Sequence, residues 1–415
     1  MRNRICIFLI TVAIAAGSST VWSQSFMAGA AQKTIHPEGD SLYFAGAEKN
    51  RKFIDVEDGL YVKAFVVSHG EAELAVLTFD CIGLMYPELE KIRKRVRELI
   101  PAFQVENMVI SSTHTHTGPD VVGLWGKDNA TSGVNPEYMK VLIEKSAQTV
   151  FEAWQNRKNA KIVYAEGSHG EDWVRNISEP DVIDRSVSVM SFKDSSNKHI
   201  ATITNFACHP TILIGVTKGG SSDFVAGYYQ YLDSLQGGVN MYLQGAIGGW
   251  VQPEDVPRSY ANAMKYGRGL GVYTAELLKK SKKSASNKVE FKSSRVSLAV
   301  KNQGFRMLSQ AGVIPRPFTD SVTTEIACFS IGDALFATHP GETSPALSLS
   351  TKSLMKNKGP KFILGLGMDA LGYILKPVYF VPKNSIPHST YLTSMSVGPD
   401  TYPEVEKVLQ KLLNE

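Results

Sequence analysis

The sequence predicts an α/β fold (α+β) in which mixed β-sheets are layered with helices. Two observations support this prediction: short runs rich in Val, Ile, Phe and Thr recur along the chain, and long segments with helical periodicity lie between them. The chain has 415 residues, of which 43% are hydrophobic and 20% charged. It can therefore bury a large core, as one domain or as two closely packed ones.

Strands are predicted where these runs are bordered by Gly, Asp or Asn, at residues 60–67, 72–79, 107–112, 184–192, 199–207, 240–244 and 326–338. Helices are predicted where apolar residues recur every three to four positions, at 86–100, 137–155 and 259–280, and at 403–413, where Pro403 opens the helix. Residues 281–289 are linker-like and either separate two lobes or form a surface loop.

The first 23 residues have the layout of a secretory signal peptide. Arg2 and Arg4 precede a short apolar stretch at 5–16, and small and polar residues follow it. That stretch is too short to span a bilayer comfortably, so we expect an exported chain, periplasmic or secreted, with no transmembrane anchor after cleavage. The net charge of +4 includes both arginines, and no Lys/Arg run indicates nucleic-acid binding.

Three cysteines follow the signal segment, Cys81, Cys208 and Cys328. An odd number at wide spacing is not a disulfide framework. Each lies in an apolar, strand-like context, which favours small buried side chains over a thiol nucleophile, even though Cys208 directly precedes His209.

The strongest local feature is the strand at 107–112, which runs into Thr113-His114-Thr115-His116-Thr117-Gly118-Pro119. On an extended chain, two histidines two positions apart face the same way. This places two imidazoles at the carboxyl end of a buried strand, where open sheets have their clefts. Imidazole is the commonest protein ligand for zinc, although an isolated His-x-His is equally compatible with two surface histidines.

Two further predicted strands end in the same way. One is followed by His209-Pro210, and the other by His339-Pro340-Gly341-Glu342. Three strand ends that present His and Glu can converge on one metal as a His/His/carboxylate set with an open position, the arrangement of a catalytic zinc site. A histidine before a proline is, however, more often a plain turn residue.

At this point the sequence resembles the neutral, non-lysosomal ceramidases and their bacterial relatives. The resemblance runs in order along the chain and is most specific at the His-x-His signature. It is carried by residues 28–38 (AGAAQKTIHPE), 58–64 (DGLYVKA), 78–84 (TFDCIGL), 112–119 (STHTHTGP), 206–210 (FACHP), 222–223 (SD), 227–228 (GY), 340–343 (PGET) and 372–373 (GY).

Position by position, the resemblance implies one catalytic Zn²⁺ and a neutral-ceramidase-like catalytic domain over residues 24–415. The implied zinc ligands are His114, His209, Glu342 and Tyr373. The implied catalytic residues beside the metal are His116, Arg175 and Tyr391. Asp80 and Asp223 follow or interrupt apolar stretches, and they either orient ligand imidazoles or cap turns.

The sequence departs from the family at two places. Ceramide-cleaving members carry an Asp-Val-Ser-Pro segment after a glycine, whereas here Gly249 stands at the aspartate and Gln252 near the serine, with Trp250 expected to line a reshaped pocket. The resemblance ends near residue 415, so we expect the family's β-rich C-terminal domain to be missing. We therefore expect an exported zinc hydrolase that cleaves an amide bond of a small or lipid-like N-acyl substrate, with ceramide itself left open. The alternative is a non-catalytic lipid- or glycan-binding relative.

Overall fold

The computed structural model describes residues 25–37 and 42–414 of the chain. The signal peptide predicted at residues 1–23 lies outside these ranges, and its prediction stays a prediction. No helix in the described ranges is both long and apolar enough to cross a membrane.

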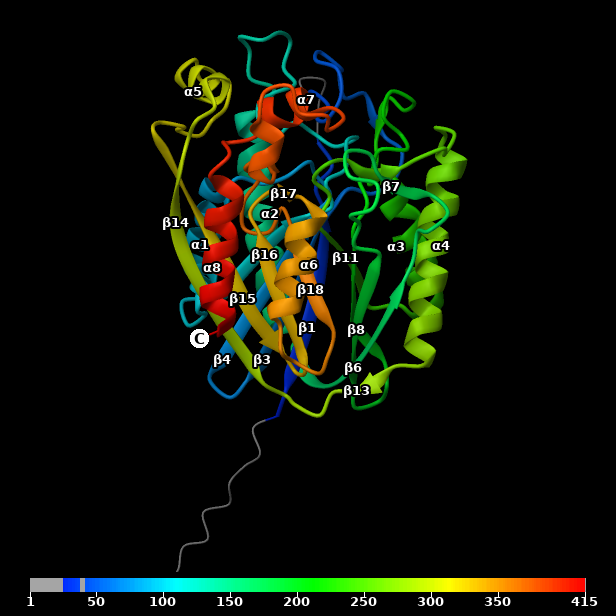
Figure 1. The fold of residues 1–415 in the computed structure, drawn as a ribbon. Coiled ribbons are helices and arrows are strands. Elements are labelled where there is room, and N and C mark those ends of the chain that lie inside the picture. The colour runs from blue at the N-terminus through cyan, green and yellow to red at the C-terminus, as the bar shows by residue number, and fades with distance from the viewer. Residues whose placement is uncertain (1–24, 38–41, 415) are drawn as a thin grey trace, which may run out of the picture.

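A large mixed sheet forms the centre of the molecule (Figure 1). Its pairings are antiparallel except for two parallel pairs, β11 with β9 and β4 with β5. The strands run in the order β11 (Val239–Gln244), β9 (His199–Phe206), β8 (Ser186–Asp194), β6 (Lys158–Ser168), β1 (Met27–Thr34), β3 (Tyr61–His69), β4 (Ala72–Phe79) and β5 (Met108–Ser112), with β13 (Lys282–Lys283) paired to β6.

The two ends of this sheet turn toward each other. Strand β11 contacts β4 and β5, which lie at the opposite end of the strand order. Two side chains bridge the halves, because Lys63 Nζ donates to the Asn240 carbonyl and Thr78 Oγ1 to the Tyr242 carbonyl. This closure brings the carboxyl ends of β5 and β9 to one end of the molecule.

A second sheet packs against this region. It consists of β14 (Val289–Ala299), β15 (Ser321–Ile331), β16 (Ala334–His339) and β18 (Lys361–Gly365). Strand β18 lies beside β9 and β5: Asn205 donates to the Ile363 carbonyl, and Met368, just after β18, donates its N–H to Ile110. The carboxyl end of β16 therefore joins those of β5 and β9.

Three two-stranded pairs complete the β-structure and lie mostly around that end. They are β2 (Asp55–Val56) with β10 (Gly219–Gly220), β7 (Val174–Asn176) with β12 (Val251–Pro253), and β17 (Glu342–Thr343) with β19 (Tyr373–Ile374).

Helices cover the outer faces of the sheets (Figure 1). The pair α1 (Tyr86–Leu99) and α2 (Pro136–Gln155) packs on β1 and β3, and the pair α3 (Phe224–Gln236) and α4 (Tyr260–Lys279) packs on β6, β8 and β11. Helices α6 (Pro345–Leu354) and α8 (Thr401–Asn414) cover the second sheet. The remaining short elements are η1 (Val105–Asn107), α5 (Gln303–Gln310), η2 (Pro377–Phe380) and α7 (Ser389–Ser394).

The predicted fold class is confirmed, and the strands and helices predicted from the sequence form close to their predicted bounds. Two details were wrong. The run at 326–338 is a hairpin, because the chain turns at Gly332, whose φ is +61°, between β15 and β16. The last helix begins at Thr401, so Pro403 lies in its first turn and does not open it.

Several elements carried no clear sequence signal, among them β1, β6, β14 and α3. Residues 281–289 contain β13 and lead into β14. The largest apolar core cluster takes side chains from both sides of this stretch, for example Val76 and Phe329, both at most 1% exposed. Their shared burial holds the segments before and after 281–289 together.

Candidate metal centre

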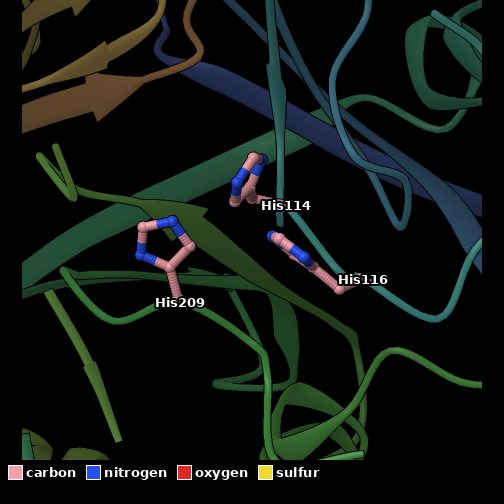
Figure 2. Close-up of side chains that lie close together, drawn as sticks. All are labelled: His114, His116 and His209. Atoms are coloured by element: carbon pink, nitrogen blue, oxygen red, sulfur yellow. The ribbon is translucent and has the colours of Figure 1, made fainter. Parts of the chain in front are cut away.

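Three histidines come together at the end of the molecule where β5 and β9 terminate (Figure 2). Each of His114, His116 and His209 offers one ring nitrogen, and these three nitrogens lie within 4.8 Å of one another. The ring centroids are 4.8 to 5.8 Å apart. We call these three residues the histidine cluster.

Each imidazole is oriented by a backbone carbonyl. The Nδ1 atoms of His114, His116 and His209 lie 2.5, 2.6 and 2.9 Å from the carbonyl oxygens of Ile82, Gly46 and Val251. A carbonyl only accepts hydrogen bonds, so each Nδ1 carries the proton and each Nε2 keeps its lone pair. This is how proteins fix the tautomer of a metal-binding imidazole.

The backbone at His114 differs from the sequence prediction. Strand β5 ends at Ser112, and His114 has φ of +66°, a left-handed conformation that is uncommon outside glycine. The two imidazoles of the His-x-His segment therefore do not meet because they share one face of a strand. They converge because a turn after β5 aims both rings inward, and such local strain is typical of functional sites.

The neighbour of His116 is a residue that the sequence analysis missed. Gly46 supplies the carbonyl that accepts from His116 Nδ1. A Cβ atom at Gly46 would lie 2.4 Å from that same Nδ1, and the φ of Gly46 is +86°. Any side chain here would push the imidazole away, so the close approach requires glycine.

His209 follows β9, as predicted. Its Nδ1 and its backbone N–H both donate to the Val251 carbonyl, at 2.9 Å each. Val251 belongs to β12, which pairs with β7. The preceding Cys208 is buried, and burial raises the pKa of its thiol well above the usual value, which disfavours a thiolate nucleophile.

Glu342 brings a carboxylate to the histidine cluster. Its Oε2 lies 3.0 Å from His209 Nε2 and 3.4 Å from His114 Nε2. The parallel pairing of β17 with β19 places Glu342 directly beside Tyr373. The structure thus brings together all four residues that the resemblance implied as metal ligands, with His116 as a fifth neighbour.

The surroundings favour the neutral form of His116 and His209 and the ionised form of Glu342. Burial lowers the pKa of His116 well below its usual value, with further lowering by the other two rings, and burial also lowers the pKa of His209. Burial alone would raise the pKa of Glu342, but His114 and His209 hold it well below its usual range. These are the protonation states in which such groups bind a cation.

An aromatic wall flanks the cluster on the side of Tyr373. The Trp250 indole N–H donates to the Tyr373 hydroxyl at 2.8 Å. The Trp250 ring also contacts His388 and Tyr391, with centroids 4.4 and 5.5 Å away. Tyr391 is 51% exposed, and burial followed by the charge of Glu342 raises the pKa of its phenol. The sequence analysis predicted Trp250 and Tyr391 near the site but missed His388.

Arg175 and Gln252 lie opposite each other in the β7–β12 pair. The Arg175 guanidinium donates to the carbonyls of Glu171 and Val174, at 2.8 and 3.0 Å, and neither of these residues belongs to the histidine cluster. Its strand supports His209 indirectly, because Asn176 of β7 is the register partner of Val251. A direct role for the Arg175 charge stays a prediction.

The two buried aspartates are bonded away from the imidazoles. Asp223 caps α3 by accepting from the Phe224 N–H and also accepts from the Leu213 N–H. Asp80 accepts from the Tyr61 N–H at 2.9 Å. Backbone carbonyls instead occupy the imidazole Nδ1 positions. The structure therefore favours the capping alternative for Asp223, whereas Asp80 bonds to the first residue of β3 and neither caps a turn nor orients an imidazole.

In the stretch that departs from the family signature, Gly249 adopts a backbone conformation that favours glycine. Gly249 has φ of +82°, and a Cβ there would lie 3.0 Å from Asn176 Oδ1 and 3.4 Å from the Tyr379 hydroxyl. An aspartate at this position would be strained and crowded. The neighbouring Trp250, also left-handed with φ of +61°, carries its side chain to Tyr373 instead.

The donor set fits a metal ion. His114 Nε2 and His209 Nε2 both lie within 3.4 Å of Glu342 Oε2, so these three atoms can share one cation. Beside them, His116 Nε2 is buried with no hydrogen-bond partner among the described residues, so it is free to meet a further ligand of the site. Imidazole nitrogens with a carboxylate oxygen match the preferences of Zn²⁺. The described residues thus form a candidate metal site whose ion is not identified by the structure.

Known proteins were compared with the chain at the levels of sequence and fold. No protein-family model matches it, and no curated protein matches it in sequence. The crystal structure of the neutral ceramidase from Pseudomonas aeruginosa does match: it has a TM-score of 0.76 and 15% identity, covering 94% of this chain and 74% of that one. The chain has the fold of the neutral ceramidases.

A second solved structure, a ceramidase complexed with C2, matches with a TM-score of 0.79 and 14% identity, covering 94% of this chain and 75% of that one. The resemblance predicted from short motifs is thereby confirmed at the level of the fold. Function depends on the site as well as on the fold.

Proposed function

We propose that this chain is a zinc-dependent amidase that hydrolyses an N-acyl bond. The observation that carries the proposal is the histidine cluster with Glu342, which combines oriented lone pairs and a carboxylate at one end of a neutral ceramidase fold. The ceramidase neighbours support amide hydrolysis as the reaction class.

His114, His209 and Glu342 are assigned to hold the zinc, with Tyr373 beside Glu342 as the fourth ligand. When bound, Zn²⁺ lowers the pKa of a water molecule and polarises a carbonyl group. The protein's contribution is to fix the ligand rings through the carbonyls of Ile82 and Val251.

In amide hydrolysis, the water oxygen bonds to the carbonyl carbon, the C–N bond breaks and the nitrogen takes a proton. His116 is suited to move that proton, because its Nε2 is unpartnered and its Nδ1 is held by Gly46. The half-exposed Tyr391 hydroxyl is suited to stabilise the developing oxyanion or to protonate the nitrogen. The products are a carboxylate and an ammonium ion.

The test combines metal analysis with turnover. We expect protein purified without chelator to hold about one zinc per chain, and His209→Ala to lose both the metal and activity, the latter by about 10³-fold or more. A matched control is His199→Ala, on the same strand β9 and bonded to Ser191 outside the cluster. His116→Ala should lose activity but keep the zinc.

Two results would contradict these assignments. Wild-type protein without stoichiometric metal would refute the zinc enzyme and favour a non-catalytic binding protein. Loss of zinc in His116→Ala would show that His116 is a ligand and would remove it from proton transfer.

A further inference from the structure

An apolar cavity opens directly beside the candidate metal centre. His114 and Glu342 form part of its lining, and the rest consists of apolar or aromatic side chains and one glycine. Its volume is about 60 Å³. This corresponds to roughly four to six atoms of the size of a water molecule or a methylene group.

The cavity is walled by two long connections that the sequence analysis did not assign to the site. Leu124 and Trp125 come from the loop between β5 and α2, and Phe305 and Phe318 come from the segment that contains α5. The two phenylalanine rings pack together with centroids 5.3 Å apart, and both are at least nine-tenths buried. A wall built from packed core side chains keeps its size.

We propose that this cavity binds the acyl group of the substrate and selects short apolar acyl chains of about four to six carbons. The inference rests on the proposed hydrolase function and deepens it. The chemistry of the lining distinguishes the acyl side from the amine side. In an acyl group only the carbonyl oxygen needs a polar partner, and the chain beyond it needs none. An amine released as a cation would be buried in this cavity without a partner, since His114 and Glu342 are assigned to the metal.

The aromatic wall at Tyr373 suits the amine. There Trp250, His388 and Tyr391 form the aromatic wall, and both His388 and Tyr391 are exposed. A leaving amine on this side reaches water as soon as the C–N bond breaks. A long acyl chain, in contrast, would overfill the cavity or have to displace Phe305 and Phe318.

The experiment is a chain-length series of fatty acyl amides of one fluorogenic amine, from acetyl to hexadecanoyl. We expect kcat/KM to rise about fourfold per methylene group up to roughly hexanoyl, the gain for burying one methylene. It should then fall at least tenfold by dodecanoyl. A flat series, or a steady rise to hexadecanoyl, would overturn the proposal.

Two variants change the cavity in opposite directions. Met395→Ala removes a partly buried side chain from the lining and should move the optimum to longer chains, and Ala370→Leu fills space and should move it to shorter ones. Met307→Ala is the matched control, because Met307 lies on α5 but is 63% exposed. An optimum that is the same in both cavity variants would contradict the assignment.

A binding measurement separates this inference from the proposed function. Carboxylates from acetate to dodecanoate are titrated into the zinc-loaded wild type by calorimetry. If no amide is cleaved but hexanoate binds more tightly than acetate and dodecanoate, the amidase is refuted and the cavity assignment stands. If amides of every length are cleaved equally and the carboxylates bind equally, the amidase stands and the cavity assignment is refuted.

Discussion

Two of the buried polar clusters among the described residues differ in how completely their polar groups are hydrogen-bonded. The first, which we call the lysine cluster, consists of Lys63, Asp80 and Tyr229 in the closed sheet. Lys63 Nζ donates to the Asn240 carbonyl and lies 3.2 Å from the Tyr229 ring centroid, and Asp80 accepts from the Tyr229 hydroxyl at 3.4 Å. Burial pushes the pKa of Lys63 down and that of Asp80 up, and the attraction between the charges opposes both shifts.

The histidine cluster is built in the opposite way. The Nδ1 atoms of its three imidazoles all hydrogen-bond to backbone carbonyls. The other ring nitrogens face one another and Glu342, and His116 Nε2 has no hydrogen-bond partner among the described residues. A buried cluster that is satisfied internally stabilises a fold, whereas one with inward lone pairs needs an ion to complete it. From this difference we predict that the lysine cluster is structural and that the histidine cluster is functional.

The largest expected effect is a loss of stability, which tests whether the lysine cluster stabilises the fold. We expect Lys63→Met to lower the free energy of unfolding by about 3 kcal/mol, because it leaves the Asp80 carboxylate buried without its cation. Urea unfolding measures the loss, and zinc content per folded chain should not change. Lys33→Met is the control, since its ion pair with Glu152 is partly exposed and contributes at most about 1 kcal/mol.

A second variant keeps this test decisive. Lys63→Met combined with Asp80→Asn removes both charges and should recover much of the lost stability. A single variant as stable as the wild type would show that the lysine cluster does not stabilise the fold. A single variant that loses zinc while it stays folded would show that the two clusters are not separate.

The sequence predicted the centre of the site better than its surroundings. His-x-His and two further strand ends were visible locally, and the sheet topology brings those ends together. The supporting carbonyls were not predictable, because Gly46 lies 70 positions from His116 and Val251 lies 42 positions from His209. Such contacts depend on tertiary structure and leave no periodic pattern.

Helix α3 shows the same limit for the fold. Its aromatic first half, Phe224 to Tyr229, has strand-like composition, and the Asp223 cap is evident only in the folded chain. Packing of its buried face against α4 overrides this local preference.

Asp58 belongs to neither the lysine cluster nor the histidine cluster. It is a partly buried carboxylate whose hydrogen-bond donors are neutral. Burial raises its pKa to about 6, and the Ser221 hydroxyl and Ser222 N–H only partly oppose this. The folded chain therefore binds the proton more tightly than the unfolded chain. The stability that this proton contributes is complete below pH 4 and is lost as the pH rises through about 6.

The raised pKa of Asp58 predicts that the folded state loses stability as the pH rises. Between pH 4 and pH 6.5, the free energy of unfolding should fall by about 2 kcal/mol more in the wild type than in Asp58→Asn, after discounting for partial exposure. Asp55→Asn, at an exposed position in the same segment, should behave like the wild type. If Asp58→Asn shows the same decline as the wild type, Asp58 is not the titrating group.

The smallest effect concerns the edge of the histidine cluster. Trp250→Phe keeps a ring but removes the N–H that donates to the Tyr373 hydroxyl. If Tyr373 is a metal ligand, this donor stabilises its phenolate, and its loss should weaken zinc binding about tenfold in competition with a chelating dye. Trp154→Phe makes the same chemical change on α2, where the indole bonds Glu73, and should leave zinc affinity unchanged.

The double variant decides how the Trp250 effect is transmitted. In a Tyr373→Phe background, Trp250→Phe should cause no further loss of zinc affinity, because its hydrogen-bond acceptor is already absent. An equal tenfold loss in that background would mean that Trp250 acts on the metal independently of Tyr373. In that case the hydrogen bond from Trp250 to Tyr373 would not be the means by which Trp250 supports the metal.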